Sequence, residues 1–331
     1  MCERKTGLEL LRVIAILGII AMHTFGHWME DCIGCDRIYG LLITSVFNTG
    51  VSCFMLISGY FGISRNIKKA FSLEILMLFY GMLYILAHYA HNDLNKEIIF
   101  GNVFPLMSNR YWYITTYIML MVISDELNYA WNRTDLKTSR IILLILVLFF
   151  YMVPTISLGK VSYTHDAGKG VINMFVVYNI GRYLRKYGKG ISKNVYYVMA
   201  LTGCLMSFGL DCIVTFLFYE KGLFYTLSLD WSVFTLLGSI GIFGIFNNVN
   251  IDCIIINKIA SLVTGIYVCE ELVRDIIVMQ IKKSEIHGIK LIIVNIMISL
   301  IVFILSALIE MIRKKTIGKI INKYLYESKY Q

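Results

Sequence analysis

The chain has 331 residues, of which 57% are hydrophobic and only 16% are charged. A soluble chain carries roughly 25% charged and about 45–50% apolar residues, so this composition excludes an ordinary soluble protein. A soluble enzyme with one membrane anchor is also excluded, because apolar runs extend from end to end. The net charge of +9 does not indicate nucleic-acid binding, since Lys and Arg are spread over many short segments between these runs.

Ten apolar stretches are long enough for membrane-spanning helices, since a hydrocarbon core about 30 Å thick requires roughly 20 helical residues. They lie at about 7–28, 41–62, 70–90, 111–131, 139–157, 170–187, 195–219, 226–247, 257–280 and 288–312. Residues 13–22 do not alternate between apolar and polar, which favours helices over barrel strands. The sequence therefore predicts an all-α bundle of about ten spans. We expect a single membrane domain over residues 1–331 with no appended soluble domain, because the segments between the stretches are short.

The basic residues predict an orientation for this bundle. If the N-terminus is cytoplasmic, 20 of the 31 Lys and Arg residues fall in inner segments and nine fall in outer segments. Cytoplasmic loops carry such an excess, so we expect both termini in the cytoplasm and a multi-pass protein of the inner or plasma membrane. The remaining two arginines, Arg12 and Arg274, lie inside expected spans.

The first expected helix carries an unusual pair of polar residues. Arg12 and His23 are eleven residues apart, so they lie on one helix face about 16 Å apart along the axis. An arginine in the membrane is costly unless it faces protein or water, and Glu9 is close enough in sequence to pair with it. Alone, Arg12 could reach the interface with its long side chain, and His23 could be a hydrogen-bonded core residue. Together on one face, the pair favours a function.

Two patterns permit metal or disulfide chemistry without requiring it. Cys32 and Cys35 form a Cys-x-x-Cys in the first expected outer loop, but no second pair supplies the further ligands of a zinc site. A local disulfide and two free thiols both remain open. His27 follows His23 at the spacing of a metal pair, yet no third ligand is evident. We therefore expect no metal site.

Polar and aromatic residues in later spans each have a structural and a functional interpretation. Ser58 and Tyr60 flank a glycine, which favours close helix packing, with a role in a site as the alternative. Trp112, Tyr113 and Tyr117 begin the fourth span, where such residues either anchor the helix at the membrane interface or stack on carbohydrate.

Charged residues also occur inside later spans. Glu270 and Arg274 have the i, i+4 spacing of an ion pair, and Glu271 and Asp275 lie beside them. Such a group is either a structural pair or a binding site for an acceptor. Asp211, in the seventh span, requires a partner or a wet cavity.

Five blocks of this sequence, in the expected order, resemble the acyltransferase-3 family of integral-membrane acyltransferases. The first is ELLRVIAILGIIAMH, in which Arg12 and His23 match the family's basic residue and histidine separated by ten residues. The others are GVSCFMLISGYFGISRNIKK, YWYITTYIMLMVISDELN, VVYNIGRYLRKYGK and IASLVTGIYVCEELV. The resemblance extends from about residue 5 to 315. The chain departs from the family in having Asp125 and Glu126 where a proline is frequent, and Glu270 where a histidine is frequent.

The resemblance implies transfer of an acyl group, usually acetyl from acetyl-coenzyme A, to a hydroxyl of a surface polysaccharide or lipid-linked glycan. Acyl-CoA would be a co-substrate, with no bound cofactor. His23 would act as general base, with a transient acyl-histidine as a weaker alternative. Arg12 would hold the donor's phosphates or thioester end. The basic cluster of Arg65, Lys68 and Lys69 would receive the nucleotide phosphates, or would serve only to set the topology.

Eight further residues are expected to bind the acceptor or support the site: Glu9, Ser58, Tyr60, Trp112, Tyr117, Tyr267, Glu270 and Arg274. The expected partners are acyl-CoA, a glycan or lipid-linked glycan, and membrane lipids, without nucleic acid. Two other functions compete. One is a transporter, which the lack of a visible internal repeat disfavours. The other is a non-catalytic partner in envelope-polysaccharide export.

Overall fold

The computed structural model describes residues 5–29, 34–217, 227–282 and 285–322, which form helices and loops with no strand among them. The first half of the chain contains α1 (Thr6–Gly26), α2 (Cys35–Phe47), α3 (Thr49–Phe61), α4 (Ile67–Ala90), α5 (Lys96–Val103), α6 (Trp112–Val122), α7 (Ser124–Arg133), α8 (Leu136–Val147), the π-helical turn η1 (Leu148–Met152) and α9 (Val153–Ile156). The second half contains α10 (Val171–Tyr187), the 3₁₀ turn η2 (Gly188–Gly190), α11 (Lys193–Leu217), α12 (Val233–Asn247), α13 (Ile254–Ala260), α14 (Val263–Val278), α15 (Ile289–Lys315) and α16 (Ile317–Asn322).

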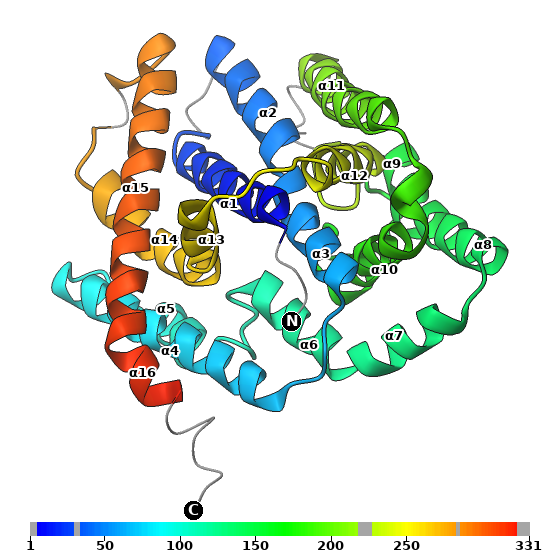
Figure 1. Ribbon diagram of the computed structural model, residues 1–331. Coiled ribbons are helices and arrows are strands. Elements are labelled where there is room, and N and C mark those ends of the chain that lie inside the picture. Colours follow the sequence, from blue (N-terminus) through cyan, green and yellow to red (C-terminus); the bar gives the residue numbers. More distant parts are fainter. Residues whose placement is uncertain (1–4, 30–33, 218–226, 283–284, 323–331) are drawn as a thin grey trace, which may run out of the picture.

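Helix α1 lies at the centre of the bundle. It contacts α2, α3, α12, α13, α14 and α15, and these helices surround it in Figure 1. Its apolar residues pack on several sides, and Ile16 and Ile20 are fully buried. Because neighbouring helices surround α1, the polar positions along it also face protein rather than lipid.

Six segments are long and apolar enough to cross a membrane, judged by length and composition. They are Thr6–Gly26, Cys35–Phe61, Ile67–Ala90, Leu136–Ile156, Lys193–Leu217 and Ile289–Lys315. The predicted all-helical class is confirmed for the described residues, whereas the count of about ten spans and the position of the termini are not.

The fourth expected span shows why the count differs. Residues 111–131 were expected to form one helix, but α6 ends at Val122 and the polar helix α7 begins at Ser124. The acids Asp125 and Glu126 lie in the first turn of α7, where the helix dipole favours negative charge. Helix α12 is also apolar but has only 15 residues.

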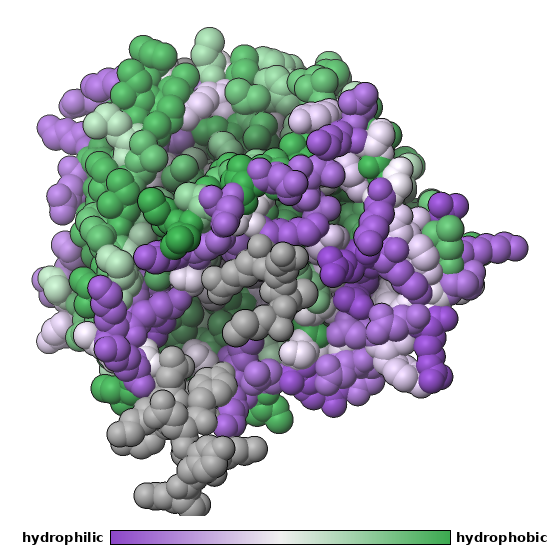
Figure 2. All heavy atoms as spheres, in the orientation of Figure 1, coloured by the Kyte–Doolittle hydropathy of each residue, from purple (hydrophilic) through white to green (hydrophobic). Residues whose placement is uncertain are grey.

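The outward faces of the long helices are strongly apolar. In Figure 2, hydrophobic residues gather along the side formed by α15, while hydrophilic residues cross the lower centre of the same view. Large apolar side chains exposed on α15 include Ile293, Met297, Leu300, Ile304 and Leu308. Contiguous exposed apolar surface of this extent is typical of a protein embedded in lipid.

Helices α3 and α10 approach each other through glycines. A Cβ atom added at Gly59 would lie 2.1 Å from the carbonyl oxygen of Tyr178, and one added at Gly181 would lie 2.5 Å from that of Leu56. The Ser58–Gly59 pair was predicted to permit close packing, and the contact of Gly59 with α10 confirms it. This contact fixes the position of α3, which lines the cavity described below.

Replacing Gly59 by alanine should destabilise the bundle, because the added methyl group would overlap backbone atoms of α10. Overpacking of this kind costs about 1–3 kcal/mol, so we expect a lower thermal unfolding midpoint of the detergent-solubilised protein. Gly209→Ala is the matched control, since a Cβ there would meet no heavy atom within 4 Å. Equal unfolding midpoints for the two variants would contradict the proposed contact.

Candidate functional site

A cavity of about 260 Å³ lies between α1, α3, α4, α6 and α14, closed in part by the loops before α10 and α12. Its wall is mostly apolar. The lining residues with charged or hydrogen-bonding side chains other than tyrosine and tryptophan are Arg12, His23, Asn48, Ser58, Lys69, Lys169, Asp230 and Thr264. Such a cavity, with few polar groups on an apolar wall, is typical of small-molecule sites.

Arg12 and His23 both line this cavity, as their shared helix face predicted. Helices α1 and α3 run antiparallel, because Lys5 contacts Tyr60 whereas Ile19 contacts Gly50. The cavity therefore has two ends. We call the part around Arg12, Ser58 and Lys69 the Arg12 end, and the part around Asn48, Lys169 and Asp230 the Asp230 end.

The two basic residues at the Arg12 end are held by neighbouring side chains. Nη1 of Arg12 donates to both carboxylate oxygens of Glu9 at 3.2 Å, which confirms the predicted pair. Glu9 itself is only 7% exposed. Lys69 donates to the hydroxyl of Tyr117 at 2.6 Å. Both cations line the cavity, and each is held in place by hydrogen bonding to a neighbouring side chain.

His23 is held by a carboxylate from another helix. Its Nδ1 lies 2.8 Å from Oε1 of Glu270, and Oε2 of Glu270 accepts a hydrogen bond of 2.5 Å from Nη1 of Arg274. The predicted ion pair between Glu270 and Arg274 is therefore confirmed. Glu270 is 3% exposed, so its two carboxylate oxygens are shared between an imidazole and a guanidinium inside the protein.

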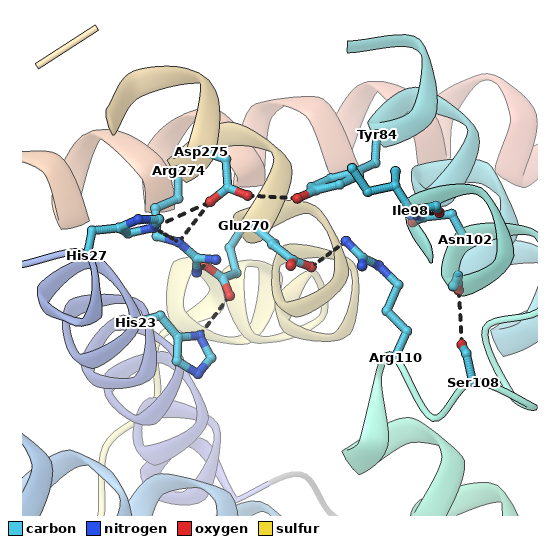
Figure 3. A network of polar contacts seen from close by, with 12 residues as sticks. His23, His27, Tyr84, Ile98, Asn102, Ser108, Arg110, Glu270, Arg274 and Asp275 are labelled. Atoms are coloured by element: carbon cyan, nitrogen blue, oxygen red, sulfur yellow. Dashed lines mark hydrogen bonds and ion pairs between the residues drawn. The ribbon is translucent and has the colours of Figure 1, made fainter. Parts of the chain in front are cut away.

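The same network continues away from the cavity, as Figure 3 shows. Nε of Arg274 donates to Nε2 of His27 at 3.1 Å and lies 3.4 Å from a carboxylate oxygen of Asp275. The other oxygen of Asp275 accepts a hydrogen bond from the hydroxyl of Tyr84 at 2.9 Å. These contacts fix the Arg274 side chain, which in turn orients Glu270 toward His23.

This arrangement determines what His23 can do chemically. If Nδ1 carries the proton and donates it to Glu270, the lone pair of the neutral ring is on Nε2. A carboxylate that holds a histidine in this way fixes the tautomer and stabilises the imidazolium formed on proton uptake. The pair of His23 and Glu270 thus has the geometry of a general base with its orienting acid.

Aromatic side chains form much of the cavity wall. Trp112, Tyr113 and Tyr117 line it from α6, and Tyr267 lines it from α14. The ring centroids of Tyr113 and Tyr267 are 6.2 Å apart, and Tyr113 also packs against Phe54. These four aromatic residues therefore form part of the cavity wall.

Three other expected site residues lie outside this cavity lining. Arg65 forms an ion pair with Glu126 of α7, and its Nε donates to the carbonyl of Val122 at 2.8 Å. Lys68 is half-buried in the first turn of α4. Of the three residues of the basic cluster, Lys69 is the one that lines the cavity. The hydroxyl of Tyr60 accepts hydrogen bonds from Lys5 and Arg185.

Sequence reasoning missed the residues of the Asp230 end. Asp230 lies within the stretch 226–247, where a carboxylate in an apolar run was a usable signal, whereas Asn48 and Lys169 gave none. Asp211, which was expected to require a partner, accepts hydrogen bonds from the backbone of Leu227 and the hydroxyl of Ser228. It thereby fixes the loop that carries Asp230.

The described residues contain no group of three or more His, Cys, Asp and Glu side chains arranged to hold a metal ion. Cys32 lies outside the described residues, so the choice between a disulfide with Cys35 and two free thiols stays open.

Comparison with known proteins identifies the family. The model of the acyltransferase-3 family, described as an acyltransferase domain, matches residues 5–312. No curated protein and no solved structure shows significant similarity to the chain. The matched region contains α1 to α14 and most of α15, and with them the whole cavity lining. The chain therefore belongs to the acyltransferase-3 family, as the resemblance of its five sequence blocks predicted.

Proposed function

We propose that this protein is a membrane O-acyltransferase that moves an acyl group, most simply acetyl, from acyl-CoA to a hydroxyl of a surface polysaccharide or lipid-linked glycan. One observation carries the proposal: His23, held by a buried carboxylate, shares a single cavity with Arg12. The family supports acyl transfer in general. The choice of acyl-CoA as donor and of a glycan hydroxyl as acceptor is inferred from the chemistry of the cavity residues and from the resemblance of the sequence blocks.

In the proposed reaction, His23 removes the proton from the acceptor hydroxyl as the oxygen attacks the thioester carbonyl carbon. The new C–O bond forms, the C–S bond breaks, and the coenzyme leaves as a thiolate that takes the proton back from His23. Glu270 stabilises the imidazolium formed between these two proton transfers. Direct transfer requires no acyl-histidine, although the ring could also form one.

The donor is proposed to enter from the Arg12 end. Coenzyme A carries several phosphate charges, and Arg12 and Lys69 are the lining cations at that end. Only Nη1 of Arg12 is used in its bonds to Glu9, so the fork of the guanidinium has further donors for a phosphate or a thioester oxygen. The excess of basic residues in the expected inner segments agrees with a cytoplasmic position for this end.

Replacing His23 by alanine should abolish most of the transfer, because the hydroxyl would lose its base. General-base catalysis contributes about 10²- to 10⁴-fold, so we expect at least a 100-fold loss. The measurement is transfer of label from acetyl-coenzyme A to surface glycan, with the amount of protein in the membrane matched between variants. Full transfer by a normally produced His23→Ala protein would exclude His23 as the base.

Replacing Glu270 by glutamine should lower the turnover number and leave donor affinity unchanged, since the amide retains the shape but cannot stabilise an imidazolium. We expect a decrease of at least tenfold in kcat, with partial recovery in Glu270→Asp if the shorter carboxylate still reaches the ring. Separate titrations of donor and acceptor would distinguish this effect from general misfolding, which would also alter acetyl-coenzyme A binding. A wild-type kcat in Glu270→Gln would contradict the role.

Replacing Arg12 by alanine should weaken donor binding, because charge-assisted hydrogen bonds to phosphate or carbonyl oxygen would be lost. A contribution of about 1.5–3 kcal/mol corresponds to an increase of roughly tenfold or more in the Kd for acetyl-coenzyme A. Arg65→Ala is a matched control, because Arg65 pairs with Glu126 outside the cavity. An unchanged Kd in Arg12→Ala would remove the donor role.

A further inference from the structure

The Asp230 end of the cavity is built by three segments that are far apart in the sequence. Asn48 lies at the junction of α2 and α3, Lys169 precedes α10, and Asp230 precedes α12. The Nδ2 group of Asn48 donates to the carbonyl of Ser228 at 2.7 Å and to Oδ1 of Asp230 at 3.3 Å. The junction of α2 and α3 is thereby joined to the loop before α12.

The loop that carries Lys169 packs against the backbone of Asp230 and Trp231. Gly168 has a φ of +82°, and a Cβ there would lie 2.3 Å from the backbone nitrogen of Trp231. Only glycine permits this combination of positive φ and close backbone approach. Lys169 follows directly, and it lies close enough to Asp230 for their charges to interact. The fold therefore places the backbone at Lys169 beside the segment that carries Asp230.

Asp230 has hydrogen-bonding capacity that the described part of the protein does not fill. It is 1% exposed and lines the cavity. A carboxylate accepts up to about four hydrogen bonds, whereas Asn48 is the one donor to it among the described residues. Buried polar groups require hydrogen-bond partners, so the remaining capacity of Asp230 favours a ligand that brings hydroxyl or other N–H and O–H donors.

The two titratable groups at this end limit the class of ligand. Burial raises the pKa of Asp230 to about 7, so this carboxyl carries only part of a negative charge near neutral pH, and Lys169 would repel a cationic group. A neutral polyhydroxyl group satisfies both, since its hydroxyls donate to the carboxylate and its oxygens accept from the ammonium. Aromatic side chains on the same cavity wall, including Trp112 and Tyr267, offer apolar faces to the rest of such a ligand.

We propose that Asn48, Lys169 and Asp230 form the binding site for the sugar unit of the acceptor, as a neutral unit with neighbouring free hydroxyls. This inference rests on the proposed acyl transfer. The site binds two hydroxyls that are not modified and thereby determines which other hydroxyl reaches His23. Asp230 and Lys169 are thus specificity-determining residues, and Asp230 is separate from the His23–Glu270 pair.

Two variants test the site. Asp230→Asn retains the shape and an oxygen that can accept from Asn48, and Lys169→Met removes an exposed charge, so both should fold. Lys160→Met is the matched control, because Lys160 lies in the same loop but not in the cavity lining. The probes are labelled acetyl-coenzyme A and the polysaccharide extracted from the envelope of the producing cells. Transfer by detergent-solubilised protein is measured against polysaccharide concentration, and the acetylated position is read by NMR.

Asp230→Asn should raise the KM for polysaccharide about tenfold, because a charge-assisted hydrogen bond to the sugar is lost. Lys169→Met should raise it several-fold, and both should broaden the acetylated positions. Lys160→Met should match the wild type, and the Kd for acetyl-coenzyme A should be unchanged in all three. An unchanged polysaccharide KM and an unchanged acetylated position in both site variants would overturn the sugar site and leave the transferase function standing.

A binding measurement separates this inference from the proposed function. Neutral oligosaccharides released from the same polysaccharide are titrated into the purified wild type and Asp230→Asn without any acyl donor. Weaker binding by Asp230→Asn supports the sugar site even if the wild type transfers no acetyl. Absence of transfer by the wild type would overturn only the transferase proposal. Equal binding by the two proteins, or none by the wild type, overturns the sugar site.

Discussion

The buried pair of Glu270 and Arg274 is the interaction on which the site depends. Glu270 lies inside the protein with one oxygen on Arg274 and the other on His23. Removing one partner of such a pair leaves an uncompensated charge and costs about 3–5 kcal/mol. The remaining bonds of Arg274, to His27 and Asp275, hold the guanidinium in place. The orientation of one imidazole is therefore set by a network that spans α1, α4 and α14.

The position of that imidazole also depends on the packing of the helices. Because α1 is surrounded by other helices, the face that carries Arg12 and His23 opens onto a cavity rather than onto lipid. The close contact of Gly59 with α10 fixes α3, which forms a second wall. Glu270, which holds His23, is only 3% exposed. An electrostatic interaction at so buried a group, such as that of Glu270 with His23, is stronger than it would be in solvent.

The sequence predicts those features that depend on a single helix. The shared face of Arg12 and His23, and the pairs Glu9–Arg12 and Glu270–Arg274, follow from helical geometry alone, and all are observed. The bond from His23 to Glu270 joins helices almost 250 residues apart in the chain, so no local spacing could reveal it. Nor could hydropathy alone reveal that α6 ends at Val122, since residues 118–123 are all apolar. Arg65 and Lys69 are close in sequence and were therefore expected in one cluster. Arg65 instead forms an ion pair with Glu126 of α7, outside the cavity lining.

In the proposed function, the two ends of the cavity bind two different substrates. At the Arg12 end, Glu9 offsets Arg12 but Lys69 remains, so the lining favours an anionic donor. At the Asp230 end, burial raises the pKa of Asp230 to about 7, and this carboxyl and the ammonium of Lys169 can both hydrogen-bond to a neutral, hydroxyl-bearing acceptor. In the proposed reaction the two substrates then approach His23 from opposite ends, and neither must leave for the other to enter. A direct transfer requires both substrates to be bound at once, because the acceptor oxygen and the thioester carbon have to be present together beside the same ring nitrogen.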